Sequence, residues 1–394
     1  MGERFLNGYP LNGKWHRPEI GVVSAYVDQR PEGDLSWPRA QKHSFQIYPT
    51  IAETLCLGSD RMSVGAVLLI AEHGDKPTSE KEQKLYPRYE FFQQIVDVFR
   101  QDGTAVPVFN DKHLSYSFEK AQRMVLAPKE LQFPFLAGSS LSATFRLPPL
   151  ELPINCVLED ALMIGVGGSD AMDYHALEAM QCMVERRRGG ETGVTAVQFI
   201  EGDEVCMASR PNSRWSRRLL EGALACSDSR CGIGLSDGRP QDLAYSGELE
   251  QLVENPSAYF IEYNDGWQAT LPMLNGAVQD YTFAAKVQDL PEVQSTQFLV
   301  ASDAQRDLFS LSNRQGGRDD RFRPGTVSGA ANASRQRHVG ALSRISPQRP
   351  SSAGNARVER LLPGTGSIAF LRGVRVTDEY SALTADECVH FHGV

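Results

Sequence analysis

Four apolar runs alternate with helical patterns in the N-terminal part of the chain, and this alternation constrains the fold more than any other feature. The runs span residues 21–27, 64–71, 105–109 and 133–138. Residues 86–101 and 117–127, which lie between the later runs, carry apolar side chains at helical spacing. Continuous apolar runs are typical of strands buried on both faces of a parallel sheet, with helices as the crossovers. The sequence therefore predicts an α/β domain with a parallel sheet over residues 1–150.

The pattern changes after residue 150. A helix is predicted over 174–186, and strands are predicted at 258–263 and 267–274 on either side of Asn264-Asp265-Gly266, which is a strong hairpin signal. Further strands are expected over 281–287 and 296–300. Antiparallel pairs that follow a parallel half predict a Rossmann-like domain followed, over residues 151–300, by an α+β domain with an antiparallel sheet.

A second boundary lies near residue 301, where the composition changes abruptly. Residues 301–394 contain 13 Arg, no Lys and nine acidic residues, a net charge of +4, whereas residues 1–300 have a net charge of −13. The segment is rich in Ser and Gly and has long stretches without strand or helix periodicity, so we expect it to be largely disordered. Two alternatives stay open. One is an arginine-rich nucleic-acid arm, although its charge is dilute. The other is a slipped reading frame, because GC-rich DNA read out of frame loses Lys and gains Arg, Ser and Gly.

Composition restricts the functional classes further. The formal net charge of the chain is −9, which argues against a uniformly basic nucleic-acid binder. No stretch approaches the roughly 18–20 apolar residues of a membrane span. The seven cysteines are scattered, which is typical of reduced thiols in a cytoplasmic protein. Cys226 and Cys231 have no second pair at zinc-site spacing, so we expect no metal site. The expected partner is therefore a small molecule, and neither nucleic acid nor a membrane.

Two groups of polar residues follow the first two apolar runs. Asp28 ends the run 21–27, where an acid of a dinucleotide-binding fold accepts hydrogen bonds from ribose hydroxyls; the alternative is an ordinary turn residue. Glu72 and His73 leave the run 64–71 at the edge where open α/β sheets bind ligands, and the alternative there is a solvated loop. The glycines ahead of Asp28 do not form the loop that holds a pyrophosphate, and no strand precedes them. We therefore expect the parallel sheet to be incomplete at its N-terminus, without its first strand.

The segment Asn110-Asp111-Lys112-His113 is the strongest local signal. It follows the run 105–109 and comes shortly before a predicted helix. A lysine at the carboxyl edge of a sheet can be desolvated, and it can then donate a proton or polarise a carbonyl group. The alternative is a surface turn.

The order of these features resembles the N-terminal half of the glucose–fructose oxidoreductase / inositol 2-dehydrogenase family (Gfo/Idh/MocA). The resemblance covers residues 21–138 and rests on Asp28, on Tyr48–Glu53 and on Val108–Leu114. In that family a Glu-Lys-Pro motif supplies a lysine near the nicotinamide and the substrate. Lys112 stands at the position of this lysine, with Asp111 in place of Glu and His113 in place of Pro. The resemblance thus implies a catalytic Lys112 and a cofactor, NAD or NADP. The residues expected to bind this cofactor are Asp28, Glu72, His73 and Asp111.

The same family carries a catalytic Asp and His on a helix that follows a Gly-Gly. Here Gly167-Gly168 precedes Asp170, Asp173 and His175, although at different spacings. The resemblance implies His175 as a general acid/base, assisted by Asp173 or Asp170. It further implies hydride transfer between a nicotinamide and a sugar- or polyol-like alcohol, and a homo-oligomer that pairs through the open sheet. The alternative is a non-catalytic or cofactor-independent ligand-binding protein on the same fold, which the missing glycine-rich loop favours.

Overall fold

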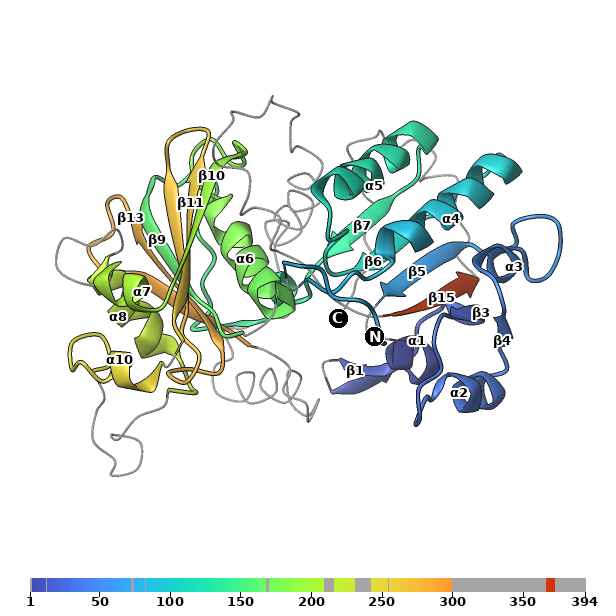
Figure 1. The fold of residues 1–394 in the computed structure, drawn as a ribbon, viewed down its shortest axis with the longest axis horizontal. Coiled ribbons are helices and arrows are strands. Elements are labelled where there is room, and N and C mark those ends of the chain that lie inside the picture. Colours follow the sequence, from blue (N-terminus) through green and yellow to red (C-terminus); the bar gives the residue numbers. More distant parts are fainter. Residues whose placement is uncertain are drawn as a thin grey trace. The chain divides into compact units, whose positions relative to one another are not determined.

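The computed structural model describes residues 2–11, 13–71, 74–81, 83–167, 170–208, 216–230, 242–253, 255–299 and 366–372. The described residues form two compact units, and each has its own sheet (Figure 1). The first unit runs to Gly138 and includes residues 366–372, and the second begins at Ser139. No helix in the described part of the chain is long and apolar enough to cross a membrane.

The first unit is built on a six-stranded sheet with the order β4-β3-β15-β5-β6-β7. The strands are β3 (Gly21–Val27), β4 (Gln46–Tyr48), β5 (Ala66–Ala71), β6 (Val108–Asp111), β7 (Phe135–Gly138) and β15 (Gly366–Arg372). The pairs β3–β4, β5–β6 and β6–β7 are parallel, whereas β15 runs antiparallel to both of its neighbours. The four apolar runs are thus strands of one sheet, and the prediction of a Rossmann-like parallel-sheet domain is confirmed.

Strand β15 comes from the segment that the sequence predicted to be largely disordered. It pairs with β3 on one side and with β5 on the other, so it lies in the middle of the sheet. The expectation of disorder is wrong for these seven residues, and it stays a prediction for the rest of 301–394, which lies outside the described residues. Strand β15 thus supplies a strand in the middle of the sheet that the sequence analysis did not predict.

Helices cover this sheet as crossovers between its strands (Figure 1). They are α2 (Ser36–His43), α3 (Ile51–Cys56), α4 (Arg88–Asp102) and α5 (Phe118–Leu131), preceded by α1 (Gly2–Asn7) and by a hairpin of β1 (Tyr9–Leu11) and β2 (Lys14–His16). The Thr50 hydroxyl caps α3 by accepting a hydrogen bond from the Glu53 amide at 3.1 Å, as expected for a capping box. Gly103 ends α4 with φ 72°, which glycine adopts without strain. The apolar stripe of α4, including Phe92 and Ile95, is buried against the sheet.

The second unit contains a seven-stranded sheet with the order β10-β11-β12-β9-β13-β14-β8. Its strands are β8 (Arg146–Leu147), β9 (Leu158–Ile164), β10 (Val194–Glu201), β11 (Ser257–Tyr263), β12 (Gln268–Met273), β13 (Tyr281–Val287) and β14 (Gln294–Phe298). All neighbouring pairs are antiparallel except β9–β12. This confirms the prediction of an α+β part with a largely antiparallel sheet.

Two helices cover the opposite faces of this second sheet (Figure 1). They are α6 (Asp170–Val184) on one face and α8 (Arg217–Cys226) on the other, and shorter helices are η1 (Leu141–Ala143), α7 (Asp203–Ala208) and α10 (Leu249–Leu252). The predicted hairpin joins β11 to β12, where the Gly266 amide donates to the Tyr263 carbonyl at 2.9 Å. Gly266 has φ 77°, the left-handed conformation that closes a three-residue hairpin loop.

Candidate functional site

The carboxyl edge of the first sheet positions Lys112. Strand β6 extends two residues further than predicted, so Asn110 and Asp111 belong to the strand and Lys112 is the first residue beyond it. Lys112 adopts φ 66°, and its amide donates to the Gly138 carbonyl at the end of β7, 3.0 Å away. The left-handed conformation is uncommon for a residue with a long side chain. It persists because the neighbouring strand and the residues around it fix the turn.

The amine of Lys112 lies in a largely buried position beside a carboxylate. Its Nζ is 3.8 Å from Asp111 Oδ2, and its side chain is 21% exposed. Burial lowers the pKa of Lys112 to about 8, because a charged amine loses hydration when it leaves water. Burial also raises the pKa of Asp111, and the nearby Arg88 guanidinium offsets part of that rise. Near neutral pH, Lys112 can therefore both donate and accept a proton.

Three buried polar residues, Asn110, Arg88 and His113, hold the turn at Lys112 in place. The Asn110 side-chain amide donates to the carbonyl oxygens of Asp111, Lys112 and His113 at 3.4, 3.3 and 3.1 Å. Arg88, at the start of α4, places Nη1 2.8 Å from Nδ1 and 2.6 Å from Nε2 of the His113 ring. Asn110 and Arg88 are each fully buried, and His113 is 3% exposed. The sequence analysis did not single out Asn110, although an amide between an apolar strand and a Lys is a readable signal.

Asp28 lies where it was predicted, directly after β3, but its carboxylate already has partners. Lys76 Nζ forms an ion pair and a short hydrogen bond with Oδ2, and the Tyr26 hydroxyl donates to Oδ1 at 3.1 Å. A ribose would have to share or displace these donors. Glu72 and His73, the other residues predicted at this edge, lie outside the described residues.

The second unit holds the other two predicted catalytic residues, both on α6. His175 Nδ1 is in short hydrogen-bond contact with the Ser139 hydroxyl. The Tyr259 hydroxyl donates to Asp173 Oδ2 at 2.5 Å. Burial raises the pKa of Asp173, and the Tyr259 hydrogen bond opposes that rise. His175 and Asp173 thus contact different partners, and no hydrogen bond between them is found in the described part of the chain.

The sequence analysis missed Glu178, a further titratable residue on α6. It is 6% exposed, and its Oε2 accepts a short hydrogen bond from the Ser139 amide. Burial raises its pKa to about 7. An acid between the inward-facing residues Ala176 and Ala179 was the available signal. Glu178 and His175 both contact Ser139, so this serine links the two protonatable groups.

The Gly-Gly segment before α6 could expose amides to an anion, because glycines lie ahead of a helix N-terminus. Its Gly167 amide donates to the Asn275 side-chain oxygen at 2.6 Å, so this amide is already used within the protein. Gly168 lies outside the described residues. The described part of the loop therefore supports a structural role.

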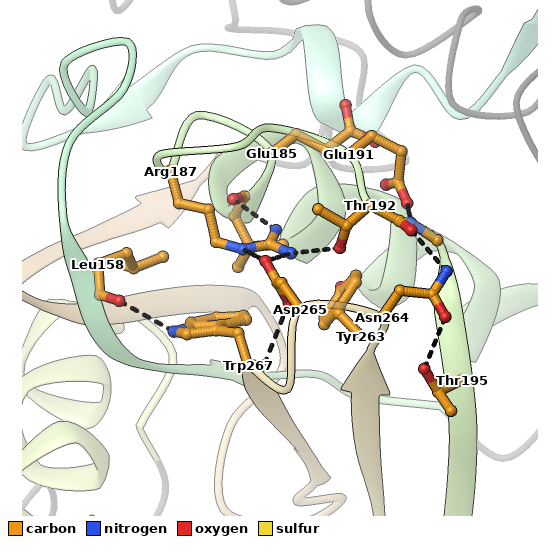
Figure 2. A network of polar contacts seen from close by, with 12 residues as sticks. Leu158, Glu185, Arg187, Glu191, Thr192, Thr195, Tyr263, Asn264, Asp265 and Trp267 are labelled. Atoms are coloured by element: carbon orange, nitrogen blue, oxygen red, sulfur yellow. Dashed lines mark hydrogen bonds and ion pairs between the residues drawn. The ribbon is translucent and has the colours of Figure 1, made fainter.

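A second polar network joins the C-terminal end of α6 to the predicted hairpin (Figure 2). Arg187 is 2% exposed, and its guanidinium lies 4.5 Å from the Tyr263 ring and 4.9 Å from the Trp267 ring. It forms an ion pair with Asp265 at 2.9 Å and donates to Thr192 at 3.1 Å. Because the donors of Arg187 point to groups of the protein itself, we interpret this network as a brace for the hairpin.

Within the described residues, no group of three or more His, Cys, Asp or Glu side chains is arranged to hold a metal ion. The spacing Gly-x-Gly-x-x-Ala does occur at residues 364–369. Its described part, from Gly366 onward, is an extended strand and not a turn before a helix. The described chain thus offers a lysine–carboxylate pair at the carboxyl edge of one sheet, and a histidine and two buried carboxylates on a helix of the other unit.

No protein-family model and no curated protein matches the sequence. Among solved structures, the chain is similar to GenD2 from gentamicin A biosynthesis in complex with NAD, with 12% identity, 82% of this chain and 86% of that chain covered, and a TM-score of 0.39. It is also similar to myo-inositol dehydrogenase from Lactobacillus casei in complex with NAD(H) and myo-inositol, with 10% identity, 74% and 68% covered, and a TM-score of 0.39. A third similar structure, described as a dehydrogenase from Bordetella bronchiseptica RB50, has 14% identity and a TM-score of 0.35, with 64% of this chain covered. The match spans 53% of that third protein.

Proposed function

We propose that the chain is an oxidoreductase-like protein that moves a hydride between a nicotinamide cofactor, NAD or NADP, and the alcohol carbon of a sugar- or polyol-like small molecule. The observation that carries the proposal is Lys112, a largely buried amine with a lowered pKa at the carboxyl edge of a parallel sheet. Open α/β sheets bind their ligands at that edge. The resemblance of residues 21–138 to the Gfo/Idh/MocA family supports the same assignment.

In this proposal Lys112 moves the proton that accompanies the hydride. When the alcohol is oxidised, the neutral amine accepts the hydroxyl proton, and in the reverse direction the ammonium returns it to the carbonyl oxygen. A pKa of about 8 keeps both forms populated near neutral pH, which a general acid/base requires. Asp111 stabilises the charged form from 3.8 Å away. In the second unit, His175 is the proposed general acid/base, assisted by Asp173 or Asp170.

The residues of the first unit fit part of a nicotinamide dinucleotide. When bound, the nicotinamide would supply the hydride acceptor, and Lys112 would hold and move the proton of the alcohol. Asp28 is an acid at the end of β3, where ribose hydroxyls are held in dinucleotide-binding folds, although Lys76 and Tyr26 already bind it. The described residues offer no site for the pyrophosphate of the cofactor. The central strand β15 is antiparallel, and its described residues form no turn into a helix.

This mismatch favours an alternative function, a ligand-binding protein on the same fold that uses no dinucleotide. In that case the Lys112–Asp111 pair would recognise a polar group of a ligand without transferring a proton. The two functions differ in whether a reduced nicotinamide binds.

Fluorescence titration of the full chain with NADH and NADPH distinguishes them. Saturable binding, together with turnover of a polyol or sugar that falls about 10²–10⁴-fold in Lys112→Ala, would support the oxidoreductase. A matched control is Lys120→Ala, which removes a lysine that pairs with Glu90 on the first unit. The dehydrogenase assignment is withdrawn if the folded chain binds neither cofactor, and the ligand-binding alternative then remains.

A further inference from the structure

The second unit contains a buried carboxylate near the C-terminal end of α8, and it has no cationic partner among the described residues. Asp280 is 5% exposed. Its Oδ2 accepts hydrogen bonds from the Ser227 hydroxyl at 2.9 Å, from the Asp228 and Ser229 amides at 3.2 and 3.3 Å, and from Gln297 Nε2 at 2.9 Å. Its other oxygen, Oδ1, has no hydrogen-bond partner among the described residues. All four donors thus converge on one oxygen, and the second is left buried and unsatisfied.

Two further unsatisfied oxygens belong to side chains on the same face of the sheet. Thr282 on β13 and Gln297 on β14 are directly opposite one another in the strand register, so their side chains are neighbours. They are 0% and 6% exposed, and in the described structure neither Thr282 Oγ1 nor Gln297 Oε1 has a hydrogen-bond partner. Asp280 precedes Thr282 by two positions, which places it on the same side of the chain, and its carboxylate contacts Gln297 directly.

The face that these residues share is the one covered by α8. Ser295, two positions before Gln297, contacts Cys226 at the end of α8 at 3.1 Å. Ala284, two positions after Thr282, belongs to the apolar cluster that includes the inner side of α8. The C-terminal end of a helix carries partial negative charge and favours a cation.

Among the residues that the structure describes, no cationic side chain neutralises this pocket of oxygens. Arg230 directly follows Ser229, whose amide contacts Asp280. The Arg230 guanidinium, however, is hydrogen-bonded to the Leu224 and Ala225 carbonyls. In the part of the chain that the structure describes, no lysine, arginine or histidine forms an ion pair with Asp280. Buried charges in proteins are paired or bind a metal ion. A carboxylate, a hydroxyl and an amide oxygen are hard ligands that suit alkali and alkaline-earth cations.

We propose that Asp280 Oδ1, Thr282 Oγ1 and Gln297 Oε1 bind one monovalent cation, Na⁺ or K⁺, between the sheet of the second unit and the end of α8. A single carboxylate supplies one negative charge, which a monovalent cation neutralises and a divalent one exceeds. The cation would stabilise the second unit by linking β13 to β14 and to the turn after α8.

Thermal unfolding of the full chain tests the site. We would compare KCl and NaCl with N-methylglucamine chloride at equal ionic strength, because screening by salt is then the same. A ligand that binds only the folded state increases the ratio of folded to unfolded protein in proportion to its concentration above Kd, about 100-fold at 100 times Kd. We expect the melting temperature to rise in KCl, NaCl or both, with the logarithm of the salt concentration above Kd, and the two salts identify the preferred ion.

A pair of matched variants locates the effect. Thr282→Val removes a ligand without changing the shape of the side chain, and we expect it to abolish the ion-specific rise, whereas Thr282→Ser retains it. Thr296→Val is the control, because Thr296 is also fully buried but its hydroxyl donates to the Pro148 carbonyl at 2.7 Å on another side of β14. It should lower stability and keep the response to the cation. Thallium NMR of Tl⁺, which replaces K⁺ at oxygen-lined sites, should show bound ion in wild type, Thr282→Ser and Thr296→Val, and none in Thr282→Val.

Three outcomes would overturn the proposal. Equal melting temperatures in all three salts would mean that only an ordered water satisfies these oxygens. Stabilisation by CaCl₂ and not by the monovalent salts would contradict the charge argument. A full cation response in Thr282→Val would place the ion elsewhere.

Discussion

The amine of Lys112 should react with an acylating reagent faster than an ordinary lysine does at about pH 7.5. With a pKa of about 8, in place of the usual 10.5, roughly a quarter of the amine is neutral at that pH, against about 0.1% for an exposed lysine. The neutral, reactive fraction of Lys112 is therefore about 200-fold larger than that of an exposed lysine. An amine of lower pKa is a weaker nucleophile, which costs about tenfold if amines follow the dependence known for thiols. The 21% exposure of the side chain reduces access further, so we expect a net advantage of a few-fold to about tenfold.

The measurement is competitive labelling with acetic anhydride at a series of pH values, followed by mass spectrometry of the modified peptides. The midpoint of the rate against pH gives the pKa directly and does not depend on access, so the expected midpoint for Lys112 is near 8. Lys120 is an internal control. Burial alone would lower the pKa of Lys120, but its hydrogen bonds with Glu90 and Tyr116 raise it, and its midpoint should therefore lie above that of Lys112.

The same pKa has a consequence for stability. The unfolded chain keeps the Lys112 proton up to about the usual 10.5, whereas the folded chain releases it near 8. Between these pH values the unfolded state binds more protons, so the free energy of unfolding increases with pH. The separation corresponds to about 3 kcal/mol at most, and Lys112→Met should remove this dependence and stabilise the protein at neutral pH. A labelling midpoint near that of Lys120 would refute the desolvation argument and leave Lys112 as an ordinary surface lysine.

Four further variants test particular contacts. Asn110→Ala should cost about 1–3 kcal/mol, because three carbonyl oxygens lose a buried donor, and should move the Lys112 labelling midpoint upward as the turn loosens; an unchanged midpoint would show that Asn110 does not position Lys112. Ile368→Pro should destabilise the first unit by about 3 kcal/mol or more, because proline is excluded from central strands, and hydrogen exchange should then increase in β3 and β5; unchanged protection would mean that β15 is not required there. Burial raises the pKa of Glu185 above its usual 4.5, so the contribution of Glu185 to stability is present at low pH and is lost as pH rises through its folded-state pKa. Glu185→Gln should flatten this decline when urea unfolding is measured at a series of pH values. A variant whose stability falls with pH in parallel with wild type would refute this expectation. Arg187→Lys should cost about 3–5 kcal/mol in the same assay, because the bidentate and stacked geometry is lost and Asp265 remains partly buried, and a cost below about 1 kcal/mol would contradict the role of the network as a brace.

Most of the fold could be predicted because its signals are local. Apolar runs such as Ala66–Ala71, the helical stripe of α4, the capping box at Thr50 and the Asn264-Asp265-Gly266 turn each indicate one element, and each element forms near its predicted bounds. Strand β15 could not be predicted in the same way. Its partners β3 and β5 lie about 300 residues earlier in the sequence, and a short apolar run within an Arg- and Ser-rich segment does not indicate which sheet it joins.

The candidate site was predictable in its residue types and not in its contacts. Lys112 could be singled out because a strand edge limits where it can lie. The partners that set its properties, such as Asn110 and Gly138, are brought in by the fold. The same holds for Asp28. Its position was predicted, but its ion pair with Lys76 could not be read from the sequence.

The direction of β15 bears most strongly on how a nicotinamide dinucleotide would bind under the proposed function. In a dinucleotide-binding fold, the central strand ends at the carboxyl edge of the sheet and turns into a helix whose N-terminus holds the pyrophosphate. Strand β15 is antiparallel, so its first residue, Gly366, lies opposite Ala71 at that edge, and its last, Arg372, lies opposite Gly21 at the other. The chain thus enters the sheet where a phosphate-binding loop would leave it. A nicotinamide could then be held by the Lys112 side of the edge and a ribose by Asp28, without the anion site between them. We therefore expect a fragment that contains only the nicotinamide and its ribose to lose less affinity for this protein, relative to the intact cofactor, than it does for a dehydrogenase with the glycine-rich loop.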